Sequence, residues 1–220
     1  MKQISGGVAA PKGFTASGVH CGVKKGKGDG NQPPMSKMPE VLEGKKDLAL
    51  IVSEQPCTAA AVYTMNRVKA APLYVTMDHL ENGEAQAIVA NSGNANACAP
   101  NSHEHAEEMC QLAARAPGLK ASDFVVASTG VIGQELNISA IQAGLPACAA
   151  DLSKDGSDAA ANAIMTTDTV KKEMAVTCSV GGKTVTIGAI AKGSGMIHPN
   201  MGTMLCFVTT DCAITHEMLS

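Results

Sequence analysis

The strongest constraint on the fold is a pair of glycines between two strand-like segments. Residues 176–180 and 183–187 are rich in β-branched side chains, and Gly181 and Gly182 separate them. A two-residue turn of this kind joins antiparallel strands and requires positive φ angles, which glycine adopts without steric cost. The spacing therefore predicts a β-hairpin, and the second strand is expected to continue to Lys192.

Four short apolar runs predict buried strands. They cover residues 48–53, 85–90, 124–127 and 204–208. Runs of four to eight apolar residues are typical of strands buried on both faces, and their length disfavours a core helix.

Three segments between these strands predict helices. The first begins at Ser102, which we expect to be the N-cap, and ends before Pro117 and Gly118. Two alanine-rich helices are expected around residues 140–150 and 157–165. Ser139 is the expected N-cap of the former, and Pro146 is expected to kink or split it. Alternating strands and helices with a late hairpin indicate an α/β or mixed α+β domain.

The composition narrows the function classes. The chain has 220 residues, 45% of them hydrophobic, so it can bury a sizeable core. Only 2% are aromatic and the net charge is −3, which disfavours partners such as nucleic acid or an anionic membrane. No stretch approaches the length of a membrane span.

The eight cysteines and the N-terminus indicate a cytoplasmic protein. No two cysteines form a C-x-x-C pair, so the spacing for a zinc or redox site is missing, and we expect no metal. The first residues have no apolar segment of a secretory signal, so reduced thiols are the simplest interpretation. The Gly- and Lys-rich residues 24–34 predict a mobile surface loop.

Residues 192–205 could carry chemistry. Gly202 directly precedes Thr203, and self-cleavage requires a small residue there, because the threonine hydroxyl must reach back to the preceding carbonyl. Hydrolysis of the resulting ester would leave Thr203 with a free α-amine that can accept the proton of its own hydroxyl. The alternative is a threonine that starts a strand because of its β-propensity.

Three other polar segments allow two interpretations each. Residues 128–130 (Ser-Thr-Gly) suit an oxyanion hole but also an ordinary strand-to-loop turn. The threonines of residues 165–169 could bind a polar substrate, or Asp168 could serve a local turn. The Asn-rich residues 91–96 favour a structural turn over substrate binding. His103 and His105 would point to different helix faces, which disfavours a metal pair.

Taken together, these segments resemble the ornithine acetyltransferase (glutamate N-acetyltransferase) family. The similar segments lie in family order across nearly the whole chain: residues 6–8, 58–66, 90–97, 128–133, 163–169 and 191–205.

The resemblance implies the N-terminal half of a layered α-β-β-α sandwich of the aminopeptidase/ornithine-acetyltransferase type. It also implies a precursor that cleaves itself between Gly202 and Thr203. Residues 1–202 would then be an α-chain-like region, and residues 203–220 the start of a β chain whose remainder is absent. The expected partner is the β chain from the same precursor, in an α2β2 or higher assembly.

The resemblance further implies an enzyme of arginine biosynthesis. Thr203 would take the acetyl group from N2-acetylornithine and pass it to glutamate. The Thr129 hydroxyl and the Gly130 N–H match the family's oxyanion hole, and Thr166 and Lys192 match substrate-binding positions. No cofactor is implied, although some members also use acetyl-CoA as a donor.

The sequence departs from the family pattern at two places. Residue 202 is Gly where many relatives carry Ala, and family members continue for about as long again beyond Ser220.

Two other hypotheses remain: a related N-terminal-nucleophile amidase or aminopeptidase with water as acceptor, and an inactive fragment that needs a second chain.

Overall fold

The computed structural model describes residues 1–24, 44–195, 201 and 204–220. The strands are β1 (Lys2–Ile4), β2 (Phe14–Val19), β3 (Leu48–Thr58), β4 (Glu84–Asn94), β5 (Phe124–Val131), β6 (Lys172–Val180), β7 (Lys183–Lys192) and β8 (Leu205–Thr210). The helices are η1 (Gly7–Ala9), α2 (Ala71–His79), α3 (Ser102–Ala114), η3 (Ala121–Asp123), α4 (Ile138–Ala150), α5 (Ser157–Ile164) and α6 (His216–Leu219).

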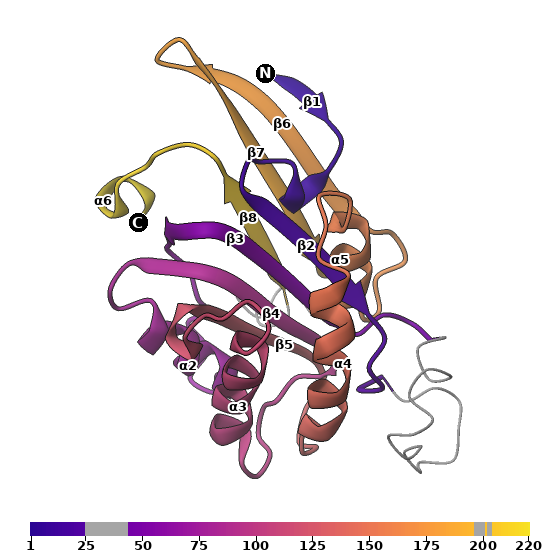
Figure 1. The fold of residues 1–220 in the computed structure, drawn as a ribbon. Helices are drawn as coiled ribbons and strands as arrows, with labels where there is room; N and C mark the ends of the chain where they lie inside the picture. Colours follow the sequence, from indigo (N-terminus) through magenta and orange to yellow (C-terminus); the bar gives the residue numbers. More distant parts are fainter. Residues whose placement is uncertain (25–43, 196–200, 202–203) are drawn as a thin grey trace.

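In the described part of the chain the strands form two four-stranded sheets (Figure 1). The β3 sheet has the order β2-β3-β4-β5, and the β7 sheet has the order β1-β6-β7-β8. β4 and β5 are parallel, whereas the other neighbouring strands are antiparallel. The mixed α/β class predicted from the sequence is confirmed.

The predicted hairpin joins β6 to β7. Gly181 and Gly182 have φ angles of 56° and 78°, and Val180 pairs with Lys183 directly beside them. β7 continues to Lys192 as expected. The four apolar runs lie in β3, β4, β5 and β8, so these predictions are also confirmed.

The core lies on both faces of the β3 sheet. Helices α2, α3 and α4 cover one face, and α5 with the inner face of the β7 sheet covers the other (Figure 1). The first core includes fully buried side chains from four elements: Leu50, Val75, Met109 and Phe124. The second joins α5 to both sheets: Ala49, Ala127, Ile164, Ile190 and Phe207. The layers are therefore the helices α2, α3 and α4, then the β3 sheet, and then α5 together with the β7 sheet.

The outer face of the β7 sheet is open in the described residues. Met174, Ala189 and Val208 are neighbours across the sheet and therefore share a face. Met174 is 56% exposed and Val208 is 60% exposed.

Both predicted serine caps are wrong. The N-cap of α3 is Asn101, whose φ of 54° leaves Ser102 inside the helix, with its hydroxyl donating to the Ala99 carbonyl at 2.7 Å. Asn137 caps α4, because its Oδ1 accepts the N–H of Ala140 at 3.1 Å. In both cases an asparagine one or two residues earlier occupies the cap.

Pro146 does not split α4, which runs from Ile138 to Ala150 with the proline inside it. A proline removes one backbone hydrogen bond and leaves the carbonyl four residues earlier without its partner. Here that carbonyl belongs to Gln142, and both residues are exposed, so water can satisfy it.

The sequence predictions omitted β1, β2 and α2. They also gave residues 91–96 as a turn, whereas β4 continues through Asn94 alongside β5. Most of the predicted surface loop, residues 25–34, lies outside the described residues.

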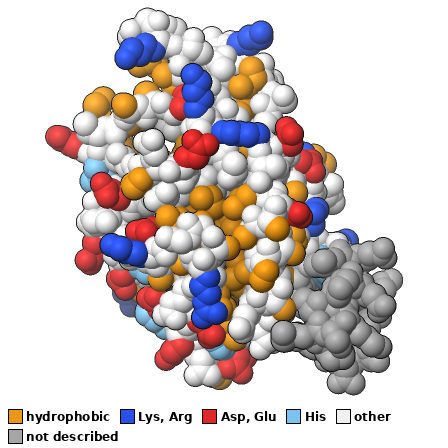
Figure 2. All heavy atoms as spheres, viewed as in Figure 1, with side chains coloured by type: hydrophobic (Ala, Val, Ile, Leu, Met, Phe, Trp, Pro, Cys, Tyr) orange, Lys and Arg blue, Asp and Glu red, His pale blue; other side chains and the backbone are white. Residues whose placement is uncertain are grey.

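In the described residues no helix is long and apolar enough to cross a membrane. Figure 2 shows acidic and basic side chains interspersed over the face in view, with hydrophobic side chains gathered toward its middle.

Candidate active site

The two sheets meet at a contact between Lys192 and Thr129. Lys192 is the last residue of β7 and is 4% exposed; Thr129 lies near the end of β5 and is 6% exposed. The Lys192 ammonium donates to the Thr129 hydroxyl oxygen at 3.2 Å. Burial lowers the pKa of Lys192, while the nearby carboxylate of Asp168 acts in the opposite direction. The contact thus places a cation beside a hydroxyl in a largely desolvated position.

Asp168 holds the loop after α5 against the end of β7. Its carboxylate accepts the N–H of Gly193 at 2.8 Å and pairs with the Lys172 ammonium at 2.6 Å. Its side chain has no exposed surface. Burial alone raises the pKa of Asp168, but the Lys172 ammonium and the N–H groups of Gly193 and Thr166 outweigh burial and lower it to about 2. The carboxylate is therefore ionised at neutral pH.

Thr166 belongs to the same loop. Its N–H donates to Asp168 at 3.4 Å, and the next hydroxyl, Thr167, lies 2.9 Å from the Ser194 hydroxyl. Because Asp168 and Thr167 both bind residues just beyond Lys192, the loop brings Thr166 to the segment that carries Lys192. Three of the predicted site positions, at 129, 166 and 192, thus belong to one connected set of contacts.

Gly130 follows Thr129 and requires glycine. Its φ is +136°, and a Cβ at this position would lie 2.3 Å from the carbonyl carbon of Gly93. Any side chain would therefore collide with the backbone of β4. The end of β5 is fixed further by the Ser128 hydroxyl, which lies 2.6 Å from Asn91 Oδ1.

The asparagines at the end of β4 support the backbone, as the sequence analysis favoured. Asn91 Nδ2 donates to the Asn94 carbonyl at 2.9 Å. Asn94 Nδ2 donates to the Gln134 carbonyl at 3.1 Å, and its Oδ1 accepts the N–H of Asn96 at 2.7 Å. These bonds satisfy backbone groups that a strand end would otherwise leave unpaired.

Chemically, the arrangement suits an anionic ligand or a developing oxyanion. The Thr129 oxygen accepts a bond from an ammonium, so its own O–H remains available to donate. Lys192 supplies positive charge where desolvation strengthens its interactions. Among the described residues, no group of three or more His, Cys, Asp or Glu is arranged to hold a metal ion.

Gly202 and Thr203 lie outside the described residues. Leu205 pairs with Lys192 at the start of β8, so the described chain resumes beside the site. The assignment of Thr203 as a nucleophile remains a prediction, as do the roles assigned to the other site residues.

Comparison with known proteins decides the family. The sequence model of the ArgJ family matches residues 36–220. The chain belongs to the ArgJ family. The resemblance to the ornithine acetyltransferases that the sequence indicated is thereby confirmed.

Relatives and solved structures agree with this. The arginine biosynthesis bifunctional protein ArgJ of Symbiobacterium thermophilum is 53% identical over 97% of this chain, which covers 50% of that protein. The chain thus spans about half the length of the curated relatives it matches. The crystal structure of the Bacillus halodurans ArgJ protein is 40% identical, with a TM-score of 0.76 over 92% of this chain and 97% of that one. Ornithine acetyltransferase from Mycobacterium tuberculosis, solved with ornithine, is 35% identical, with a TM-score of 0.73 over 90% and 96% of the two chains.

Sequence analysis missed the contacts of two charged residues, Asp168 and Lys24. For Asp168 the sequence indicated only a local turn, whereas its bond to the Gly193 N–H depends on a fold that brings residues 25 positions apart together. Lys24 was assigned to a mobile loop, but it is half-buried and donates to the Lys46 carbonyl at 2.6 Å. A lysine in a Gly- and Lys-rich segment carries no sequence signal for such a contact.

Proposed function

We propose that this chain provides the nucleophile and the oxyanion hole of an acetyltransferase. The enzyme would move acetyl from N2-acetylornithine to glutamate in arginine biosynthesis. The observation that carries the proposal is the bond from the Lys192 ammonium to the Thr129 hydroxyl oxygen at 3.2 Å. Membership of the ArgJ family supports it, as does the ornithine bound to the Mycobacterium tuberculosis relative.

The oxyanion hole consists of the Thr129 hydroxyl and the Gly130 N–H. Because Lys192 donates to the Thr129 oxygen, the hydroxyl hydrogen can point toward the reacting carbonyl. A donor placed where negative charge develops in the transition state lowers the barrier more than one that only binds the substrate. Lys192 and Thr166 also serve the α-carboxylate that donor and acceptor share.

The reaction proceeds in two balanced half-reactions. The Thr203 hydroxyl oxygen attacks the acetyl carbonyl, and its proton moves to the threonine's own α-amine. The C–N bond breaks, the proton passes to the departing amine of ornithine, and an acetyl ester of Thr203 remains. The α-amine of glutamate then attacks this ester, the C–O bond breaks, and the proton returns to the Thr203 oxygen as N-acetylglutamate leaves.

Self-cleavage between Gly202 and Thr203 would generate that amine. Residues 1–202 would form an α chain, and the β chain would begin at Thr203. Two findings support this: the solved relatives have chains of about this length, whereas the curated relatives are about twice as long. The exposed Met174 and Val208 on the outer face of the β7 sheet suit contact with the part of the β chain that follows Ser220. We propose an α2β2 or higher assembly in the cytoplasm, with no resident cofactor and acetyl-CoA as a second donor.

The test uses the full-length protein expressed from its native gene. A denaturing mass spectrum should show one chain ending at Gly202 and another beginning at Thr203. Incubation with N2-acetylornithine and glutamate should release ornithine and N-acetylglutamate in equal amounts. Thr203→Ala should stay uncut and inactive, whereas Thr215→Ala, a matched change just before α6, should be cut and active.

Two outcomes would contradict the proposal. Free acetate in place of N-acetylglutamate would indicate the related hydrolase. An uncut protein without activity would show that Thr203 never becomes an N-terminal nucleophile, as expected for an inactive fragment.

A further inference from the structure

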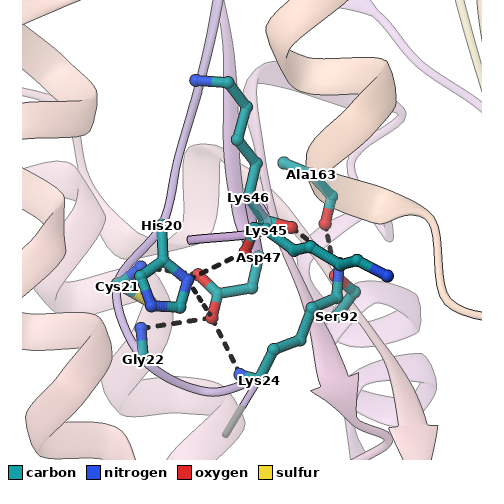
Figure 3. Close-up of polar contacts among 9 residues, drawn as sticks. All are labelled: His20, Cys21, Gly22, Lys24, Lys45, Lys46, Asp47, Ser92 and Ala163. Carbon is teal, nitrogen blue, oxygen red and sulfur yellow. Dashed lines mark hydrogen bonds and ion pairs between the residues drawn. The ribbon is translucent and has the colours of Figure 1, made fainter. Parts of the chain in front are cut away.

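Asp47 lies outside the proposed catalytic groups, yet it is among the most buried charged residues described. It directly precedes β3 and has no exposed surface. Its carboxylate accepts three backbone N–H groups, from Cys21 at 2.6 Å, Gly22 at 3.1 Å and Lys24 at 2.8 Å (Figure 3). An ionised group is buried at such depth only when donors of this kind replace its hydration. The carboxylate therefore fixes the conformation of residues 21–24.

The surroundings of Asp47 hold it in turn. His20 Nδ1 lies 3.4 Å from the Asp47 carboxylate and 2.8 Å from the Lys45 carbonyl. The Asp47 carbonyl accepts the N–H of Ser92 at 2.9 Å, and the Ser92 hydroxyl donates to the Ala163 carbonyl. Asp47 thus binds residues 21–24 through its side chain and the end of β4 through its backbone.

Lys24, which Asp47 holds in place, contacts Gly93, the residue that follows Ser92 in β4. A Cβ at Gly93 would lie 2.8 Å from Lys24 Cγ and 3.0 Å from the Lys24 nitrogen. Gly93 has a φ of +104°, so both space and backbone conformation require glycine. The aliphatic stem of Lys24 therefore lies directly on the backbone of Gly93.

Gly93 in turn contacts Gly130. The two residues pair across β4 and β5, where the register shifts. A Cβ at Gly130 would lie 2.6 Å from the Gly93 oxygen. Movement of the Gly93 peptide would therefore displace Gly130, one of the two proposed oxyanion donors.

We propose that Asp47 is a positioning residue for the oxyanion hole. Its carboxylate fixes residues 21–24, the stem of Lys24 then covers Gly93, and Gly93 sets the position of the Gly130 N–H. This proposal rests on the proposed function, because it assumes that Gly130 donates to the reacting carbonyl. It assigns no substrate contact to Asp47.

The first experiment compares Asp47→Asn with the wild type in the full-length enzyme. The amide replaces one acceptor oxygen by a donor that faces backbone N–H groups, so residues 21–24 must shift. The burst of ornithine counts the active sites, and kcat is expressed per active site. We expect this kcat to fall about tenfold to a hundredfold, since small misplacements of catalytic groups have effects of this order. KM for N2-acetylornithine should stay within about twofold.

Asp211→Asn is the matched control. Asp211 also accepts two backbone N–H groups, from Thr186 at 2.7 Å and Lys12 at 3.2 Å, but it follows the far end of β8. This variant should lose stability and keep its kcat. Equal falls in kcat for both variants would indicate a general effect of destabilisation and would overturn the proposal.

A second pair of variants tests the contact between Lys24 and Gly93 even if Asp47→Asn does not fold. Lys24→Met keeps the aliphatic stem on Gly93, whereas Lys24→Ala removes it; both remove the charge. The proposal predicts a kcat at least about threefold lower for Lys24→Ala than for Lys24→Met. Equal values would overturn it while acetyl transfer by the wild type still stands. A wild type that transfers no acetyl group would instead reject the proposed function.

Discussion

The two sheets differ in how completely they are covered. Helices and the β7 sheet enclose the β3 sheet, and Leu50 and Phe124 within it have no exposed surface. The described residues enclose the β7 sheet on its inner face alone, where Ile190 is buried, while Val208 on the outer face is 60% exposed. The first sheet can thus be stabilised by the described residues themselves, whereas the second leaves an apolar face in water.

This difference places the candidate site at the boundary between a complete and an incomplete layer. Thr129 lies on the enclosed β3 sheet, and Lys192 lies on the half-covered β7 sheet. The proposed oxyanion donors therefore rest on a sheet that is packed on both faces, which suits groups that must be in place before the reaction. The Lys192 ammonium rests on a sheet whose outer face the described residues leave uncovered.

The largest expected effect tests whether the two sheets differ in packing. Phe124→Ala should reduce the free energy of unfolding of the chain by about 4 kcal/mol, since it removes a large side chain from a closed core. Phe207→Ala, the matched change on the inner face of the β7 sheet, should cost about half as much. Urea denaturation monitored by circular dichroism measures both. Equal losses would show that the β7 sheet is packed as completely as the β3 sheet.

An effect of intermediate size tests Asp168, whose carboxylate binds Lys172 and the Gly193 N–H beside the candidate site. Asp168 has a pKa of about 2, below its ordinary value of 3.8, so its charged form stabilises the fold. That contribution is complete above about pH 4 and is lost as the pH falls toward 2. Asp168→Asn should therefore reduce the unfolding free energy at pH 7 by on the order of 2 kcal/mol and flatten its pH dependence between 4 and 2.

Asp158→Asn is the control for Asp168→Asn. Asp158 pairs with Lys171, but its side chain is 65% exposed. Its loss should change the unfolding free energy by less than about 1 kcal/mol. Denaturation series at pH 7 and pH 3 separate the two aspartates, and similar pH profiles for both variants would contradict the assignment of Asp168.

The smallest expected effect tests the open face. Val208→Thr should change the unfolding free energy of the chain by less than about 0.5 kcal/mol. Val126→Thr, the same change at a β5 position that is 2% exposed, should cost about 1–3 kcal/mol because it buries a hydroxyl. In the full-length protein Val208→Thr should become more costly if further chain covers the face; unchanged stability there would argue against that cover.

The sequence predicted best what local patterns determine. The hairpin at Gly181 and Gly182 and the four apolar runs became strands as expected, because turn chemistry and apolar run length act over a few residues. It failed where two local solutions compete. Asparagines at 101 and 137 occupied the caps assigned to serines, and α4 is not split at the exposed Pro146.

The sequence indicated those candidate site residues that lie in segments with a local pattern, and it missed those whose contacts depend on the tertiary structure. Thr129, Thr166 and Lys192 lie in segments with a recognisable pattern, and the fold connects them. Asp47 and Lys24 carry no such pattern, because their roles arise from contacts with β4 that depend on the tertiary structure. The position of Thr203 relative to these groups stays a prediction.

The bond between Lys192 and Thr129 has a consequence for timing. It joins residues 63 positions apart, and contacts of such sequence separation form late because the intervening chain must first be ordered. Under the proposed function, the environment for chemistry at Thr203 exists only once both sheets have folded. The peptide bond before it would thus survive synthesis intact, and its cleavage would mark molecules that have finished folding.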